Sequence, residues 1–343
     1  MKTRGALQFF SAGLLFLFFS AAWGAERVSF NLNWVPHGRD IPYFVALEKG
    51  YFREEGLQVK LERGYGSADA FKKVAAGTND LGVTDPASLI LGRAQGVGLK
   101  MVGVWHDRAP YLIRTLEGSG INRPQDLVGR TLGTPPGDAT LQHLPALAEM
   151  LGFDLSKVKV VNVDGAVREA ALVGGKFDAV TGFVQQYPAV KAMAEKQGKK
   201  VKDILLAKYG LDVYALGISA KDEVLSGRAP MVRGFLKAVV RGVAFSIQSP
   251  DQATDMFIKH NPTADRTLNR QVWDLALDTI LTAAQEKLGL LHMTRDKWVK
   301  TRDVLTKALK VKRGAPVEDL YTNDFLPKVL PPKRGPRAFP PVY

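Results

Sequence analysis

Stretches in which apolar and polar residues alternate recur along the first two thirds of the chain. The first alternates Val28, Phe30, Leu32 and Trp34 with polar residues, and this period of two predicts a strand that ends at Trp34. Short apolar runs predict further strands at residues 57–62, 81–83, 99–105, 111–115, 131–133, 158–163, 177–183, 204–207 and 214–219. Between them, start and stop signals predict helices at residues 41–52, 67–77, 86–96, 139–151, 166–175 and 188–198.

This alternation of strands and helices predicts an α/β fold. Strand–helix–strand units join parallel strands by right-handed crossovers, so we expect doubly wound, mostly parallel sheets with helices on both faces. The strands fall into two successive groups, which predicts two lobes. After residue 219 the pattern is helical, with predicted helices at residues 231–248, 250–259, 265–286 and 295–309.

Residues 1–25 have the three-part pattern of a secretory signal peptide. Lys2 and Arg4 precede a mostly apolar run of 14 residues, 6–19, and small residues lead to a cleavage site expected near Ala22–Gly24. The run is shorter than the roughly 20 residues that span a bilayer, so we expect cleavage, with an uncleaved anchor as the alternative. Because the chain has no cysteine for lipid attachment, the sequence predicts a free periplasmic protein and not a lipoprotein.

The composition excludes several kinds of chemistry. Of the 343 residues, 46% are hydrophobic and 24% are charged, which is typical of a globular protein of about two domains. The lack of cysteine excludes disulfides, thiolate metal sites and cysteine nucleophiles. The five histidines lack metal-binding spacing, and the chain has neither a G-x-S-x-G motif nor a P-loop. We therefore predict no catalytic residue, no metal and no cofactor.

Positive charge is concentrated near the C-terminus. The net charge is +13, and basic clusters lie at residues 310–313 and 333–337. We expect these clusters on a solvated surface, with steering of an anionic ligand as the alternative, and we expect no nucleic-acid binding. Residues 327–343 contain six prolines, which cannot extend a sheet or a helix. This Pro-rich basic tail is predicted to be an extended strap or to be partly disordered.

Candidate binding residues follow the first strand. Open α/β sheets bind ligands just beyond the carboxyl ends of their strands. Residues 33–44 connect the first predicted strand to the first predicted helix and contain Trp34, Asp40 and Tyr43. An aromatic ring there can stack on a planar ligand. The alternatives are a core position for Trp34 and a helix-capping role for Asp40.

Other strand ends supply further candidates. The Gly/Pro turn at residues 133–140 contains Thr134 and Gly137 just before a helix start, where backbone N–H groups attract polar or anionic groups. A tight turn capped by Asp138 is the alternative. The remaining candidates at strand ends are Thr84, Asp85, Trp105, Thr181, Tyr187, Asp212 and Tyr214.

Several motifs occur in a specific order. They are Leu-Asn-Trp-Val-Pro at 32–36, Lys-Gly-Tyr-Phe at 49–52, Glu-Gly-Leu at 55–57, Pro-Gln-Asp-Leu-Val-Gly-Arg at 124–130, Gly-Lys-Phe-Asp-Ala at 175–179, Lys-His-Asn-Pro at 259–262 and Tyr-Thr-Asn-Asp-Phe-Leu at 321–326. Together they cover most of the chain after residue 25. In this combination the chain resembles the alkanesulfonate and thiamine-pyrimidine-precursor family of ABC-transporter substrate-binding proteins.

The resemblance implies a two-lobe periplasmic-binding-protein fold of type II. It implies that residues 26–110 and 213–326 form one lobe and residues 111–212 the other. Such a protein is expected to be a monomer that closes on a small molecule in a cleft between the lobes. It would then deliver that molecule to the permease of an ABC importer.

The ligand stays open between three classes. The candidate aromatics together with Asp40 and Asp212 favour a planar, aminopyrimidine-like molecule. Arg39, Arg108 and Arg114 keep an aromatic acid or a sulfonate as alternatives.

The same superfamily includes the fungal-type thiamine-pyrimidine (HMP phosphate) synthase, which uses iron and pyridoxal phosphate. A synthase-like role is therefore the alternative function. By motif position, the enzyme's lysine and histidine correspond to Thr84 and Ser88, and its opening histidine corresponds to Asp40. Its cysteine cluster corresponds to residues 213–217, which contain no cysteine. Because Schiff-base formation needs an amine, the resemblance does not extend to these catalytic residues.

Overall fold

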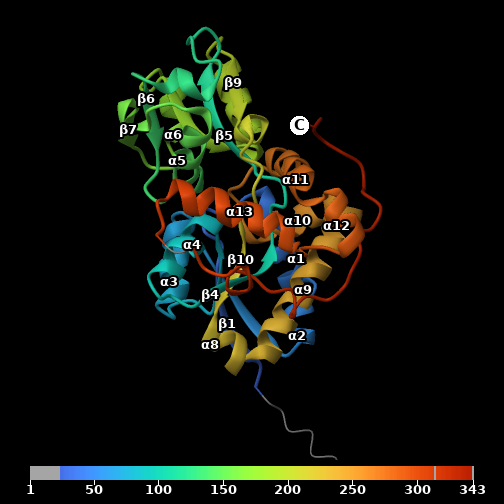
Figure 1. Ribbon diagram of the computed structural model, residues 1–343. Coiled ribbons are helices and arrows are strands. Elements are labelled where there is room, and N and C mark those ends of the chain that lie inside the picture. The colour runs from blue at the N-terminus through green and yellow to red at the C-terminus, as the bar shows by residue number, and fades with distance from the viewer. Residues whose placement is uncertain (1–23, 313, 342–343) are drawn as a thin grey trace, which may run out of the picture.

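The computed structural model describes residues 24–312 and 314–341, which form two lobes, each built around a five-stranded sheet (Figure 1). The predicted export segment lies outside the described residues except for its last two positions, 24 and 25. Within the described ranges, no helix is both long enough and apolar enough to cross a membrane.

The sheet of the first lobe has the strand order β2-β1-β3-β10-β4. Its strands, in chain order, are β1 (Glu26–Asn31), β2 (Leu57–Glu62), β3 (Leu81–Thr84), β4 (Leu99–Val104) and β10 (Gly217–Lys221). Strand β1 pairs in parallel with β2 and β3, whereas β10 is antiparallel to β3 and β4. The prediction that the first strand ends at Trp34 is wrong. The strand ends at Asn31, because Asn33 adopts a left-handed backbone (φ 62°) that turns the chain away from the sheet.

The sheet of the second lobe has the order β7-β6-β8-β5-β9. Its strands are β5 (Tyr111–Leu116), β6 (Thr131–Thr134), β7 (Lys159–Asn162), β8 (Ala179–Phe183) and β9 (Val201–Leu205). Strand β6 is parallel to β7 and β8, and β5 is antiparallel to β8 and β9. The predicted α/β class with two mostly parallel sheets is thereby confirmed.

The chain passes between the lobes twice. The first passage follows β4, and the second follows β9 and returns the chain to β10. The two passages are hydrogen-bonded to each other: the N–H groups of Trp105 and His106 donate to the carbonyl of Leu216, and the N–H of Ala215 donates to the carbonyl of His106. The predicted lobe boundaries at residues 110 and 212 fall at these two passages.

Helices cover both faces of the sheets (Figure 1). Those between the strands are α1 (Ile41–Glu48), α2 (Tyr51–Glu54), α3 (Ser67–Ala75), α4 (Pro86–Ala94), α5 (Ala139–Leu151), α6 (Arg168–Val173) and α7 (Tyr187–Glu195). After β10 come α8 (Asp222–Gly227), α9 (Ala229–Gln248), α10 (Pro250–His260), α11 (Arg266–Ile280), α12 (Ala283–Leu288) and α13 (Arg295–Ala308). Helix α13 packs against α4 of the first lobe and α5 of the second.

Two predicted helices are each divided in the structure. The segment 41–52 breaks into α1 and α2 at Gly50, whose φ of 74° is the left-handed conformation that glycine adopts without steric cost. The segment 265–286 breaks into α11 and α12, because Thr282 has extended backbone and its carbonyl accepts from Glu286, the start of a new helix.

The C-terminal tail is an extended strap along the helices of the first lobe (Figure 1). Arg337 makes two hydrogen bonds with Asp278 of α11 (2.6 and 2.9 Å), and Arg334 bonds Asp278 (3.0 Å) and Asp274 (3.2 Å). The N–H groups of Ala338 and Phe339 also donate to Asp274. The tail is therefore attached to α11 by a set of buried and half-buried ion pairs.

Candidate ligand-binding cleft

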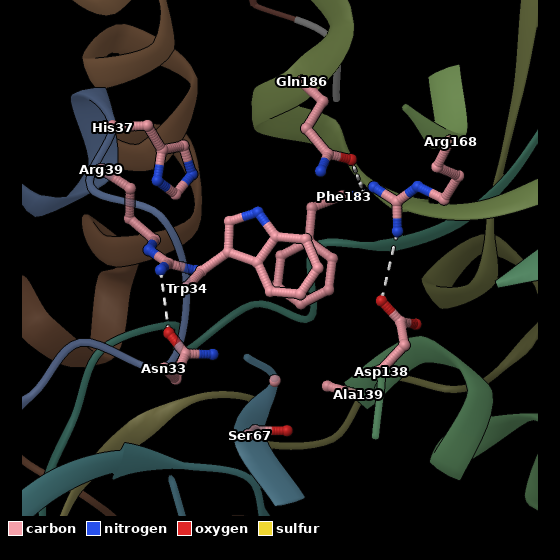
Figure 2. Close-up of a pocket in the computed structure, with 11 residues that line it drawn as sticks. Asn33, Trp34, His37, Arg39, Ser67, Asp138, Ala139, Arg168, Phe183 and Gln186 are labelled. Atoms are coloured by element: carbon pink, nitrogen blue, oxygen red, sulfur yellow. Dashed lines mark hydrogen bonds and ion pairs between the residues drawn. The ribbon is translucent and has the colours of Figure 1, made fainter. Parts of the chain in front are cut away.

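A pocket that encloses about 390 Å³ lies between the two lobes (Figure 2). We call it the inner pocket. It is lined from the first lobe by Asn33, Trp34, His37, Arg39, Gly66 and Ser67, and from the second by Asp138, Ala139, Arg168, Phe183 and Gln186. Ser67 and Ala139 are the first residues of α3 and α5. The pocket therefore lies where loops after the strands meet the amino ends of helices.

Trp34 projects its indole into the middle of the inner pocket (Figure 2). The left-handed Asn33 is held by a hydrogen bond from its N–H to Asn31 Oδ1 (3.0 Å). The N–H of Gly64 donates to the carbonyl of Trp34 (3.2 Å), and the N–H of Gly66 donates to that of Asn33 (2.7 Å). A Cβ atom at Gly64 would lie 2.3 Å from Asn33 Cα, so this position requires glycine. These contacts fix the backbone that carries the half-buried indole.

Arg39 forms the polar wall on the first-lobe side and is 3% exposed. Its Nη2 donates to Asn33 Oδ1 (2.9 Å) and its Nε to Asp40 Oδ1 (3.2 Å), while Asp40 Oδ2 contacts His37 Nδ1 (3.0 Å). Burial alone would raise the pKa of Asp40, but the charges of Arg39 and His37 and the hydrogen bonds from His37 outweigh it and lower that pKa. Asp40 thus remains ionised and compensates the charge of Arg39.

Arg168 forms the corresponding wall on the second lobe and is 1% exposed. It contacts Asp138 Oδ2 (3.3 Å) and donates twice to Glu169 Oε1 (3.0 and 2.5 Å). Asp138 also caps α5 by accepting from the N–H of Leu141 (3.1 Å). Burial raises the pKa of Asp138, although Arg168 and the hydrogen bonds oppose this.

Both buried arginines of the inner pocket therefore already have carboxylate partners. Arg39 is paired with Asp40, and Arg168 with Asp138 and Glu169. A buried cation without a counter-charge would attract an anionic ligand strongly, whereas a paired one keeps its remaining N–H groups for hydrogen bonds. The inner pocket thus combines aromatic rings with hydrogen-bond donors and little unbalanced positive charge.

The lobes are in direct contact around this pocket. The hydroxyl of Ser88 on α4 donates to Gln142 Oε1 on α5 (3.0 Å), and Lys307 of α13 pairs with Glu149 of α5 (3.0 Å). A Cβ at Gly66 would lie 2.8 Å from the carbonyl oxygen of Gly137, which shows how closely the two lobes approach. The structure therefore has the cleft in a closed arrangement.

Of the predicted site residues, Trp34 lines the inner pocket. Asp40 lies behind Arg39 and orients it through the Arg39 Nε hydrogen bond. Tyr43 and Trp105 stack on each other with ring centroids 4.6 Å apart and are at most 1% exposed. These two rings belong to the hydrophobic core and do not line the inner pocket.

Four predicted residues form buried hydrogen bonds that organise the strand ends. Thr84 bonds the hydroxyl of Ser219 on the neighbouring strand (2.7 Å), and Thr181 donates to Thr134 (2.8 Å). Asp85 caps α4 by accepting from the N–H of Ser88 (3.0 Å) and also accepts from the hydroxyl of Ser67. Their side chains support the pocket-lining loops and do not line the inner pocket.

The remaining predicted residues lie elsewhere. Gly137 has a φ of 74° and forms the turn that contacts Gly66, so glycine is required there. Asp212 pairs with Lys297 beside the second passage between the lobes (3.5 Å). Tyr187 faces Phe339 of the tail, with ring centroids 6.2 Å apart. Tyr214 packs against Trp298, and burial, opposed by hydrogen bonds with Thr294, raises the pKa of its hydroxyl to about 12.

Sequence reasoning missed most of the lining residues of the second lobe. Phe183 and Gln186 lie between the two predicted residues of one strand end, Thr181 and Tyr187, and are not themselves predicted. Nothing in the sequence indicated that Arg168 would line a pocket, since a single arginine at the start of a short helix is usually solvated.

Among the described residues, no cluster of three or more His, Asp or Glu side chains could hold a metal ion.

Comparison with solved structures defines the class of fold. The aliphatic sulphonate binding protein SsuA from Escherichia coli superposes with a TM-score of 0.65 and 16% identity, over 91% of this chain and 96% of that one. SsuA is described as periplasmic. The two sheets, the two passages and the interlobe pocket are thus those of a periplasmic-binding-protein fold, as predicted.

Sequence comparison then gives the family. The NMT1/THI5 like family matches residues 39–253, so the chain belongs to that family. The riboflavin-binding protein RibY of Chloroflexus aurantiacus is 26% identical over 309 residues, which cover 88% of this chain and 86% of RibY. A 4-amino-5-hydroxymethyl-2-methylpyrimidine phosphate synthase of Legionella pneumophila is 26% identical, over 88% and 93% of the two chains. The formylaminopyrimidine-binding protein of Halalkalibacterium halodurans is 25% identical, over 77% and 79%.

Proposed function

We propose that this protein is a periplasmic solute-binding protein that captures a neutral, planar nitrogen heteroaromatic in the inner pocket. It then delivers this ligand as a monomer to the permease of an ABC importer and catalyses no reaction. The observation that carries the proposal is the composition of the pocket. One aromatic ring from each lobe, Trp34 and Phe183, lies with two buried arginines that already have carboxylate partners.

Each part of this pocket matches a property of such a ligand. The indole of Trp34 offers a stacking face. Asn33, Gln186 and the free N–H groups of the arginines offer hydrogen bonds to ring nitrogens and carbonyl oxygens. Two relatives are named for binding riboflavin and formylaminopyrimidine, which are both planar nitrogen heteroaromatics.

A sulfonate fits the pocket less well. Its negative charge would be placed among Asp40, Asp138 and Glu169, which already balance Arg39 and Arg168. The likeness to SsuA is at 16% identity and concerns the fold. A neutral ring therefore suits the charge balance better than an anion does.

A synthase role is the alternative function, but this chain lacks the catalytic groups of the synthase at the positions that correspond to them by motif. Thr84 is fully buried and bonded to Ser219, so it offers neither an amine nor access. Ser88 is bonded to Asp85 through its N–H and to Gln142 through its hydroxyl. Thr84 thus holds β3 to β10 within the first lobe, and Ser88 links the two lobes, so both positions have structural roles.

Isothermal titration calorimetry tests the proposal. Purified protein is titrated with formylaminopyrimidine, riboflavin and ethanesulfonate, and ligand carried through native purification is identified by mass spectrometry. We expect at least one heteroaromatic to bind and ethanesulfonate not to bind. Binding of ethanesulfonate alone would contradict the proposal, as would pyrimidine synthesis by the protein supplied with iron and pyridoxal phosphate.

A further inference from the structure

A second pocket, of about 600 Å³, opens at the entrance of the cleft beyond Trp34. We call it the mouth pocket. Its walls are Trp34, Val35 and residues 63–65 of the first lobe and residues 135–136 and 164–166 of the second. Both lobes contribute to it, so its walls come together only when the lobes are in contact.

The mouth pocket adjoins the inner pocket, because neighbouring residues of the same loops line the two spaces. Residues 63–65 line the mouth pocket, and the next two residues, Gly66 and Ser67, line the inner pocket. In the same way Pro135 and Pro136 are followed by Asp138 and Ala139, and residues 164–166 are followed by Arg168. Trp34 lines both pockets. The two spaces are therefore the inner and outer parts of one cleft.

The walls of the mouth pocket are mainly aromatic and apolar. Tyr65 is 61% exposed there, which is unusual for so large a ring, and the guanidinium carbon of Arg63 lies 4.7 Å from its ring centroid. Pro135 and Pro136 face it from the second lobe. Such walls stabilise a flat apolar group by burial and stacking. Arg63 and Asp164 supply polar groups at the rim.

Trp34 is positioned by both lobes at the boundary between the two pockets. A Cβ atom at Gly165 would lie 2.2 Å from Cζ2 of the indole, so the indole edge rests directly on the backbone of the second lobe. A ligand that reaches from one pocket to the other therefore stays in contact with Trp34 along its path.

We propose that the mouth pocket binds a second ring of the ligand, fused or linked to the ring in the inner pocket. This inference rests on the proposed function and specifies the ligand class as heteroaromatic molecules of more than one ring. The first ring is selected by the hydrogen-bonding groups of the inner pocket. The second ring is held by Tyr65 and the two prolines.

Two variants separate this inference from the proposed function. Tyr65→Ala removes the stacking ring, and Ala166→Phe fills the mouth pocket from an exposed position that tolerates a larger side chain. Tyr51→Ala is the matched control, because Arg241 lies 3.9 Å from the Tyr51 ring in a similar stack that lines neither pocket. The probes for calorimetry are riboflavin, with three fused rings, and formylaminopyrimidine, with one.

We expect Tyr65→Ala and Ala166→Phe each to weaken riboflavin binding about tenfold or more, the range for loss of a stacking platform. Binding of formylaminopyrimidine should stay within about twofold, and Tyr51→Ala should change neither affinity. The inference is overturned if the wild type binds formylaminopyrimidine but not riboflavin, or if riboflavin binding is unchanged in both variants. It is also overturned if both probes lose affinity equally. If neither probe binds the wild type, the proposed function fails as well.

Discussion

Trp34 is the residue on which the site depends most. It is half-buried, held by the backbone of Gly64 and Gly66, and lines both pockets of the cleft. Trp34→Ala should weaken binding of whichever heteroaromatic probe binds by about 1–3 kcal/mol, and Trp34→Phe should recover part of this loss. Calorimetric titration and urea unfolding are measured on the same samples.

Trp273→Phe is the control for Trp34. That tryptophan is fully buried in α11 and donates to the carbonyl of Ser246 (2.9 Å). Its replacement should reduce the free energy of unfolding and leave the affinity of the folded protein unchanged. If Trp34→Ala behaves in the same way, with lost stability and unchanged affinity, Trp34 is not a ligand contact.

Gly165 provides a second prediction at the scale of one residue. Gly165→Ala places a methyl group where it meets the indole of Trp34, so the indole must move or the lobes must separate. We expect at least a tenfold loss of affinity for the heteroaromatic probe, with little change in stability, because Gly165 lies in an exposed loop. Gly227→Ala, which meets no atom within 4 Å, is the control for the glycine substitution itself. Equal affinities of the two variants would contradict this role.

Strand-end reasoning identified segments that line the inner pocket, but several of the side chains it selected there do not line it. It identified residues 33–44, residues 133–140 and the strand end with Thr181 and Tyr187, and all three regions contribute to the inner pocket. Within them it preferred Tyr43 and Tyr187 over Arg39 and Phe183, because the orientation of a side chain in a loop depends on local turns. The left-handed Asn33 is such a turn, and nothing in the hydrophobic pattern indicates it.

At the scale of elements, α11 connects the tail to the cleft. Its carboxylate Asp274 is 1% exposed and pairs with Arg270 (2.9 Å) and Arg334 (3.2 Å). The same helix packs against Gly38, where a Cβ would lie 2.1 Å from the carbonyl oxygen of Asn269. The tail therefore stabilises the helix that supports the segment carrying His37 and Arg39.

This arrangement predicts a large effect of removing the Asp274 charge. Asp274→Asn removes the buried carboxylate shared by Arg270 and Arg334, which keep only Asp251 and Asp278 as carboxylate partners, so the free energy of unfolding should fall by about 1.5–3 kcal/mol. The control is Asp303→Asn, which affects an exposed pair with Arg302 and should cost no more than about 1 kcal/mol. Chemical denaturation measures both. Similar losses in the two variants would show that the tail pairs contribute no more than a surface ion pair.

The positions of helices and strands were predicted well where the periodic pattern of apolar and polar residues is long, and less well where this pattern is interrupted. The sheets are formed by the predicted strand segments, but β1, β9 and β10 are shifted along the chain relative to their predicted bounds. The interruption of the helical pattern at Thr282 is not visible in the sequence, because the extended Thr282 is held by a hydrogen bond from its hydroxyl to Asp107, which is far away in the sequence. Tertiary contacts of this kind override local periodicity.

At the scale of the whole molecule, two buried histidines make stability depend on pH. Burial lowers the pKa of His106 far below its ordinary value of 6.5, and the charges of Arg39 and His37 lower it further. Burial also lowers the pKa of His143, although Asp85, a hydrogen bond to the Ala139 carbonyl and Asp138 oppose this. Both rings are thus protonated at a lower pH in the folded protein than in the unfolded chain.

The unfolded chain protonates these histidines below about pH 6.5, so it binds more protons than the folded protein does. The free energy of unfolding should therefore be highest above this pH and fall as the pH drops from 6.5 to 5, by up to about 1.4 kcal/mol per pH unit for each histidine. Urea unfolding at several pH values measures the slope. His106→Asn should reduce this slope, because it removes the buried imidazole. An unchanged slope in His106→Asn would contradict the assignment.

The alternation of strands and helices was enough to predict two lobes, since it depends on many residues at once. The contact that closes the cleft between the lobes could not be predicted from this alternation. It depends on Gly66 and Gly137 and on the pairing of Ser88 with Gln142, which are brought together only by the fold. These residues stand more than 50 positions apart in the sequence.

The placement of the tryptophans gives the protein an optical signal of its own. Of the four tryptophans in the described ranges, Trp105, Trp273 and Trp298 are at most 1% exposed and belong to the first lobe. Trp34 is half-buried, and its surroundings include the backbone of the second lobe at Gly165. Separation of the lobes changes the solvation of this one indole and leaves the other three as a constant background. The wavelength of intrinsic emission should therefore follow cleft opening in real time, without any attached dye.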